Sequence, residues 1–195
     1  MIIFAAACTF GVYQSTNMPS AFADSTLVQM QDTAKSFGLS TDTARQIQAE
    51  YVSEKSSLVG KSIDTITVDL KKGGSPTGTV QVGVFNGDLS VKQLFGIINA
   101  SDIGTANYAT YSFSLTAPQT YQIQSGDRIG IKFSGGSKSN YIAIMTDQRN
   151  TFDGTNSYLS YYTNSWHSLT GNDDLFMILK LIIAKLLIYR LFRVL

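Results

Sequence analysis

Apolar and polar residues alternate with a two-residue period through the central part of the chain. In the segment 65–70, for example, Ile66, Val68 and Leu70 are separated by polar neighbours. Successive side chains of a β-strand point to opposite faces, so this alternation predicts a strand with one buried and one solvated face. By the same reasoning, further strands are predicted at residues 80–84, 94–98, 111–115, 121–123, 129–133, 141–145, 158–162 and 175–179.

Turn-forming residues separate these predicted strands. The stretch Gly73–Gly78 is rich in glycine and contains Pro76, which predicts a hairpin connection, and Asn86-Gly87 predicts a tight turn in a loop slightly longer than two residues. Strands so numerous, with no amphipathic helices between them, favour sheets that pack face to face. We therefore predict an all-β fold, an antiparallel two-sheet β-sandwich of the jelly-roll type, over residues 45–180.

The segment 24–44 lacks this alternation. It is polar, and Leu27, Met30, Ala34 and Phe37 give it only a weak helical spacing. The sequence predicts a linker or a short helix here.

The N-terminal segment 1–23 has the features of a signal peptide. Residues 1–12 are apolar apart from Thr9, and Ala21-Phe22-Ala23 places small residues where a signal peptidase reads them. The alternatives are a lipoprotein signal at Cys8, a buried first strand and a retained membrane helix. We expect cleavage before Asp24, and therefore an extracellular or cell-surface location.

The C-terminal segment 181–195 is hydrophobic and basic, with Lys185, Arg190 and Arg193. Together with residues 175–180 it reaches the roughly 20 residues that a bilayer span requires, and arginines near the terminus fit a cytoplasmic end. Lys185 in the middle of the segment opposes insertion. The tail is interpreted as a possible membrane anchor, with an interfacial helix or a segment outside the ordered fold as alternatives.

Composition and charge exclude several classes of protein. The 195 residues suit one domain, and only 15% of them are charged, whereas there are 16 glycines, 10 tyrosines and 11 phenylalanines. All acidic residues lie between Asp24 and Asp174 and four basic residues follow them, so the body of the chain is mildly acidic. This charge distribution argues against nucleic acid as a partner. The single cysteine excludes an internal disulfide.

Catalytic motifs are missing from the sequence. His167 is the one histidine, and no Gly-x-Ser-x-Gly motif is present, so neither a hydrolytic triad nor a catalytic zinc site is expected. Asp173 and Asp174 are adjacent, and adjacent strand residues point to opposite faces, so the two cannot flank one bond. We predict a protein that is not an enzyme.

Oxygen-bearing side chains recur in the segment DQRNTFDGTN, residues 147–156. Asp147, Asn150, Asp153 and Asn156 are candidate calcium ligands, because hard cations take six to eight oxygens from loops of this kind. Asp and Asn are also ordinary turn formers. Calcium is thus a possible cofactor, and no other is indicated.

Aromatic residues gather directly after this loop. Tyr161, Tyr162 and Trp166 form, with Asn156, a candidate ligand site, because exposed rings stack on the apolar faces of sugars while amide groups bond their hydroxyls. The competing interpretation is that these rings belong to the core of the sandwich.

The chain from about Arg45 to Lys180 resembles secreted β-sandwich domains, jelly-roll and carbohydrate-binding-module-like, of extracellular archaeal and bacterial surface proteins. The resemblance is carried by EYVSEKSSLVGKSIDTITVDLKKGGSPTGTVQVGVF, YQIQSGDRIGIKFSGG and FDGTNSYLSYYTNSW. It implies a non-catalytic surface or accessory module, but no residue-level binding site.

These observations lead to one predicted function and one alternative. The first is an extracellular or cell-surface binding or adhesion module whose partner is a glycan or a component of the cell envelope. The alternative is a structural subunit of a cell envelope or appendage. Membrane contact through the C-terminal tail is compatible with either, and the sequence leaves the oligomeric state open.

Overall fold

The computed structural model describes residues 24–30, 36–147, 152–169 and 173–182. The predicted signal peptide, residues 1–23, and residues 183–195 of the predicted tail 181–195 lie outside these described residues, whereas residues 181–182 of that tail belong to the last described strand. Within the described ranges the chain forms antiparallel strands and two short 3-10 turns, η1 (Ala100–Asp102) and η2 (Gly154–Asn156). The prediction of an all-β, antiparallel fold is therefore confirmed.

Two large sheets and one small sheet contain all the described strands. Sheet A consists of β1 (Asp24–Met30), β2 (Ser36–Thr41), β5 (Thr65–Gly73), β8 (Ala109–Ser114), β11 (Tyr141–Asp147), β14 (Asp174–Leu175) and β15 (Met177–Ile182). Sheet B consists of β3 (Ile47–Val52), β6 (Thr79–Phe85), β7 (Val91–Asn99), β10 (Arg128–Ser134), β12 (Ser157–Tyr162) and β13 (Trp166–Ser168). The small sheet pairs β4 (Ser62–Ile63) with β9 (Tyr121–Gln122).

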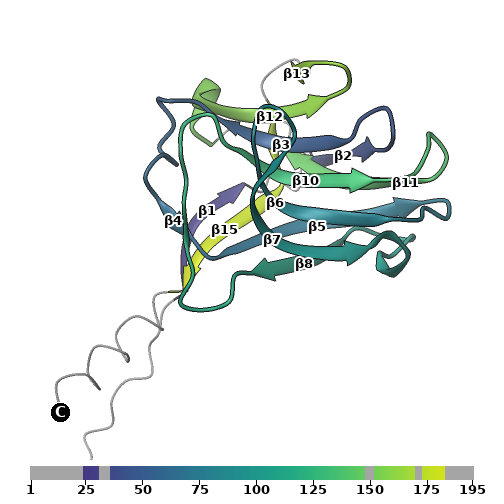
Figure 1. Cartoon of the computed structure of the whole chain (residues 1–195), viewed down its shortest axis with the longest axis horizontal. Coiled ribbons are helices and arrows are strands. Elements are labelled where there is room, and N and C mark those ends of the chain that lie inside the picture. Colours follow the sequence, from purple (N-terminus) through teal and green to yellow (C-terminus); the bar gives the residue numbers. More distant parts are fainter. Residues whose placement is uncertain (1–23, 31–35, 148–151, 170–172, 183–195) are drawn as a thin grey trace, which may run out of the picture.

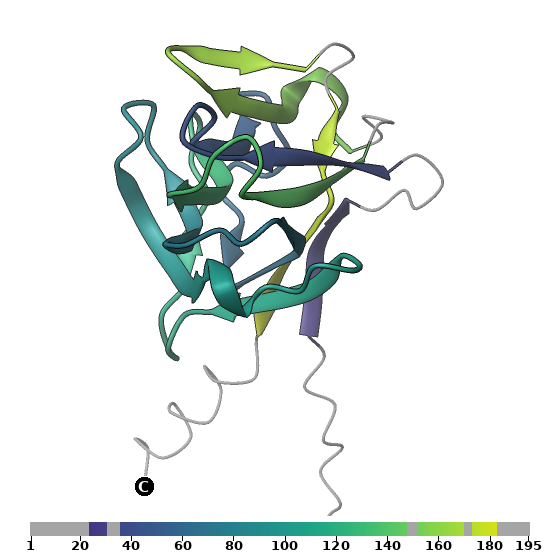
Figure 2. The ribbon, with the colours of Figure 1, turned by 90° about the vertical axis from the view of Figure 1, so that its right-hand side faces the viewer.

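The order of strands in sheet B is β13-β12-β3-β10-β6-β7, which Figure 1 shows from top to bottom. In sheet A, β11 lies between β2 and β5, and β5 also pairs with β8 and β15. Strand β1 pairs with β15, so the first and last described strands lie side by side (Figures 1 and 2).

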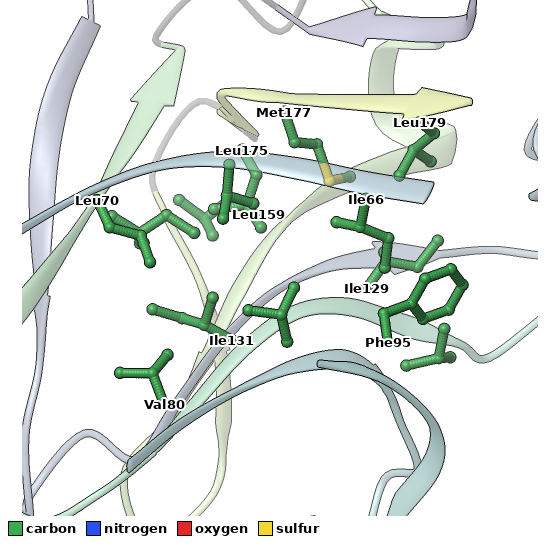
Figure 3. Packing of buried hydrophobic residues seen from close by; sticks show 14 of the residues in the cluster. Ile66, Leu70, Val80, Phe95, Ile129, Ile131, Leu159, Leu175, Met177 and Leu179 are labelled. Carbon is green, nitrogen blue, oxygen red and sulfur yellow. The ribbon is translucent and has the colours of Figure 1, made fainter. Parts of the chain in front are cut away.

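The hydrophobic core lies between sheets A and B. Ile66 and Leu70 of β5 meet Ile129 and Ile131 of β10, and all four side chains are fully buried (Figure 3). These are positions that the two-residue alternation assigned to buried faces. The alternation thus predicted the inward face of these strands correctly.

The prediction of a linker or short helix at residues 24–44 differs from the structure, in which this segment contains β1 and β2. Both strands are defined by long-range pairing, β1 with β15 and β2 with β11. The sequence around Leu27 and Phe37 has no strand pattern of its own. Its strands form because pairing with distant strands outweighs a weak local preference.

The connection after β5 also differs from its prediction. Gly73–Gly78 was expected to close a hairpin, but β5 belongs to sheet A and β6 to sheet B. The segment carries the chain from one sheet to the other. The loop after β6 fits its prediction, because β6 and β7 pair directly and residues 86–90 connect them.

A core substitution tests this packing. Ile131→Ala removes methyl groups from a fully buried side chain, so it is expected to lower the free energy of unfolding by about 2–5 kcal/mol in urea denaturation of the full chain. Ile97→Ala is the matched control, because Ile97 is 52% exposed and its loss is expected to change stability by less than about 0.5 kcal/mol. Equal effects of the two substitutions would contradict the described burial.

Candidate functional site

The outer face of sheet B, which points away from the core, carries a series of aromatic side chains. Residues directly opposite each other in an antiparallel ladder share a face. The ladder places Tyr158 opposite Tyr51, Tyr51 opposite Arg128, and Arg128 opposite Phe85. Since Ile129 of β10 points into the core, Arg128 and its three row neighbours point outwards.

Ring contacts extend this row across the sheet. The Tyr51 and Tyr158 ring centroids are 5.2 Å apart. The Arg128 guanidinium carbon lies 4.8 Å from the Tyr51 ring centroid and 4.1 Å from that of Trp166. Trp166 in turn meets Tyr162 edge-on at 5.4 Å. We call Tyr158, Tyr51, Arg128, Trp166 and Tyr162 the aromatic row; all five side chains are half-buried.

Trp166 ties two hairpins together within this row. Its indole Nε1 donates a hydrogen bond of 2.7 Å to the carbonyl oxygen of Gly87, in the loop between β6 and β7. Its ring packs with Tyr162 and Leu89 against a small buried cluster on the outer face, formed by Ile47, Ala49 and Phe85. The hairpin of β12 and β13, at the top of Figure 2, is thereby fixed to the sheet.

Small residues fill the outward positions between the Tyr158–Tyr51–Arg128–Phe85 ladder row and the row that contains Tyr162. The residues in this middle row are Ser160, Ala49, Gly130 and Gly83, and all four are buried. A Cβ atom at Gly130 would lie 2.2 Å from the backbone oxygen of Gln48, so no larger residue fits there without a backbone shift. The small residues leave room for Trp166, Tyr162 and Leu89 to pack over this part of the sheet.

The predicted aromatic site is divided by the strand alternation. Tyr162 and Trp166 lie opposite each other on the outer face, but Tyr161 points to the other face of sheet B, where it stacks on His167 at 5.3 Å. The Arg45 guanidinium lies 4.4 Å from the Tyr161 ring centroid. Tyr161 thus belongs to a different surface from the other two predicted rings.

A cavity of about 240 Å³ opens on that second surface. It is lined by Ser40, Asp42, Ala44, Arg45, Lys138 and Thr163. The Asp42 carboxylate already accepts the backbone N–H groups of Ala44 and Arg45, at 2.9 and 3.1 Å. The cavity is small and partly cationic.

The predicted calcium ligands are found in separate environments. Asp147 is fully buried at the end of β11, whereas the Asp153 carboxylate accepts the backbone N–H of Ser57 at 2.8 Å. Asn156 ends η2, where its backbone oxygen accepts the N–H of Ser53, and Asn150 lies outside the described residues. Among the residues that the structure describes, no three His, Cys, Asp or Glu side chains are arranged to hold a metal ion. Calcium stays a prediction.

Four carboxylates that the sequence did not group together meet inside the sandwich. Glu50 of β3 points inwards and is fully buried, and its Oε2 accepts the backbone N–H of Leu175 at 3.0 Å. Asp174 is fully buried beside it, directly opposite Asp147 in the ladder, and Asp173 is buried next to it. Glu50, Asp147, Asp173 and Asp174 form what we call the buried carboxylate group.

Burial changes the protonation of this group. Desolvation, and then the charge of Asp174, raise the pKa of Glu50 well above its ordinary 4.5. Desolvation raises the pKa of Asp174 from 3.8 to about 7, and the charge of Asp147 adds to this effect. Desolvation also raises the pKa of Asp173. The group is internal, so it affects stability rather than contact with a ligand.

Sequence reasoning missed Tyr51, Arg128 and Glu50 as partners in these sites. Alternation alone shows that Arg128 points away from Ile129 and that Glu50 shares a face with Val52. The register that places Arg128 between Tyr51 and Trp166 depends on pairing between strands far apart in the chain. No local signal specifies that register.

No family model, curated protein or solved structure matches the chain. The resemblance to carbohydrate-binding-module-like domains therefore stays a prediction. In the part of the chain described, no helix is long and apolar enough to cross a membrane.

The buried carboxylate group predicts a pH dependence of stability. A carboxyl whose folded pKa is raised binds its proton more tightly in the folded state, so its contribution is fully present below the unfolded pKa and is lost as pH rises through the folded pKa. For Asp174 this window runs from its ordinary 3.8 to about 7. We expect the urea midpoint to fall across this window, and Glu50→Gln, which removes one titrating member, to reduce the fall.

Asp88→Asn is the control for this measurement. Asp88 is exposed in the loop between β6 and β7, and hydrogen bonds from Ser90 lower its pKa. Its substitution should leave the slope between pH 5 and about 7 unchanged. If the urea midpoint of the wild type rises between pH 5 and about 7, and that of Glu50→Gln rises by the same amount, the raised pKa values are contradicted.

Proposed function

We propose that the protein is a non-catalytic binding or adhesion module of the cell surface or extracellular space, and that it binds glycans through the aromatic row. The observation that carries this proposal is the set of half-buried rings, Tyr158, Tyr51, Trp166 and Tyr162, on the outer face of sheet B. Aromatic rings present apolar faces to sugar rings at little cost in conformational entropy.

The strand pairing supports a jelly-roll topology for this module. A jelly roll forms when an antiparallel ribbon of four strand pairs wraps into two sheets. Four such pairs are present in chain order from the outside inwards: β2 with β11, β3 with β10, β5 with β8, and β6 with β7. Both strands of a pair lie in one sheet, and successive pairs alternate between sheet A and sheet B. On this interpretation β1, the small sheet of β4 and β9, and the strands from β12 onwards are additions to the eight-stranded unit.

The rigidity of the row supports a binding role. Trp166 is held by its hydrogen bond to Gly87 and by packing on the cluster around Ala49. A preorganised platform loses little freedom when a ligand binds. The extracellular location and the anchoring rest on the sequence alone, namely on the segment 1–23 and on the tail 181–195.

The glycan proposal is tested by affinity electrophoresis of the full chain against neutral and acidic polysaccharides. Tyr158→Ala removes a ring from the aromatic row and is expected to weaken binding about 3- to 10-fold. Tyr161→Ala is the matched control, because Tyr161 points to the other face and its loss should leave binding within about twofold of the wild type. Trp166, the single tryptophan, reports the same event by a change in its emission. If the protein migrates in every polysaccharide-containing gel at the same rate as in a gel without polysaccharide, the proposal is overturned.

A second candidate function is a structural subunit that packs against copies of itself. The observation that favours it is β7, a nine-residue strand at the edge of sheet B, on which Val91 is 39% and Ile97 52% exposed. Edge strands with exposed apolar residues promote association between chains.

Self-association distinguishes this candidate. A subunit should sediment with a concentration-dependent mass that Ile97→Lys reduces, whereas Thr110→Lys, on an exposed position of β8 in sheet A, should not. A chain that stays monomeric at high concentration contradicts the structural role.

A further inference from the structure

Arg128 is a cation held between two aromatic rings, and among the residues that the structure describes it has no acidic partner. Its guanidinium stacks on Tyr51 and on Trp166, at 4.8 and 4.1 Å. Within the described residues its one hydrogen bond runs from Nη1 to the backbone oxygen of Gly126 at 3.2 Å, and its Nε is buried with no partner. A guanidinium carries five N–H donors, so most of its hydrogen-bonding capacity is unused by the protein.

The acid that is nearest in sequence is fully engaged elsewhere. Asp127 is buried, and its carboxylate accepts hydrogen bonds from Lys92 at 2.6 Å, from the Tyr121 hydroxyl at 2.7 Å and from the Gln124 N–H at 2.8 Å. As the strand neighbour of Arg128, it also points to the other face. Asp127 therefore does not neutralise Arg128.

The outward positions of β12, β3, β10 and β6 carry cations and no acids. These fourteen positions contain two cations, Arg128 and Lys132, and no Asp or Glu; the remaining twelve are Tyr158, Ser160, Tyr162, Ile47, Ala49, Tyr51, Gly130, Ser134, Thr79, Gln81, Gly83 and Phe85. The acid of these strands, Glu50, points inwards. Lys132 donates to the backbone oxygen of Leu89 at 2.9 Å, and its charge also helps to lower the pKa of Asp88 in the same loop.

This combination of chemistry matches an acidic sugar. A planar guanidinium binds a carboxylate through two parallel hydrogen bonds, and the rings on either side can stack on the sugar that bears it. The partial burial of Arg128 lowers its pKa slightly by desolvation, and an anion placed beside it would offset that effect.

We propose that the ligand of the aromatic row is an acidic polysaccharide, a polymer of uronic-acid type, whose carboxylates bind Arg128. This inference rests on the proposed glycan-binding function and adds the class of glycan to it. Single-stranded nucleic acid also combines stacking with negative charge, so it is the competing ligand in the test below.

Polygalacturonate and its fully methyl-esterified form test this inference, because they share a backbone and differ in the carboxylate. By isothermal titration the full chain should bind polygalacturonate more tightly than the ester, and added salt should reduce the difference. Arg128→Gln should weaken binding to polygalacturonate ~10- to 100-fold and leave binding to the ester within about twofold. Arg45→Gln, which removes the cation stacked on Tyr161 on the other face, is the control and should change neither.

Arg128→Lys is the second variant, because it retains the charge and loses the planar fork. It should bind polygalacturonate more weakly than the wild type even if Arg128→Gln does not fold, and circular dichroism with Trp166 emission checks the fold of each. Equal binding of the acid and the ester by the wild type, unchanged in both Arg128 variants, would overturn the acidic-ligand inference and leave glycan binding standing. Binding of neither polymer would overturn both the acidic-ligand inference and the proposed glycan binding. Tighter binding of single-stranded DNA than of polygalacturonate would show that the ligand is a nucleic acid, and would overturn the acidic-polysaccharide inference.

Discussion

Burial of apolar side chains between sheets A and B is the constraint on which the other features depend. Each strand of the sandwich sends every second residue inwards, and the fully buried side chains of Ile66, Leu70, Ile129 and Ile131 exclude water from the space between the layers. Because those residues fix which face of each strand points inwards, they also fix which residues point outwards. Arg128 faces solvent because Ile129 does not.

The interior is not uniform, and the difference accounts for the buried acids. The core cluster fills the space under β5, β6 and β10, whereas the neighbouring region under β3 and β14 contains the inward-pointing polar residues Gln48 and Glu50. Gln48 donates to the backbone oxygen of Ser40 in β2, and Glu50 accepts from Leu175 in β14. These two contacts join sheet B to sheet A through directional bonds rather than through shape alone, which specifies how the layers align. The desolvation of Glu50 and Asp174 is the associated cost.

Much of the fold followed from residues within one strand, whereas the site required residues from several. The period of Ile66, Val68 and Leu70 identified both a strand and its buried face, and the same held for Ile129 and Ile131. The segment around Leu27 and Phe37 was misread because its strands are defined by partners more than a hundred residues away. Trp166 and Tyr162 were found as a local cluster, but Tyr161, which the sequence analysis grouped with them, points to the other face. Tyr51 and Arg128 became visible only once the ladder registers were known. Local periodicity determines a side chain's face, and only the tertiary pairing determines its neighbours.

The pairing of β1 with β15 determines how the domain can be held. Asp24 and Ile182 are partners in that ladder, so the chain enters and leaves the sandwich at adjacent points. Tethering at either end, whether to a surface, a bead or a second domain, therefore orients the sandwich in the same way and leaves the same strands at the far side. The two ends are also close enough for a short peptide to join them, which makes the domain a suitable scaffold for circular permutation.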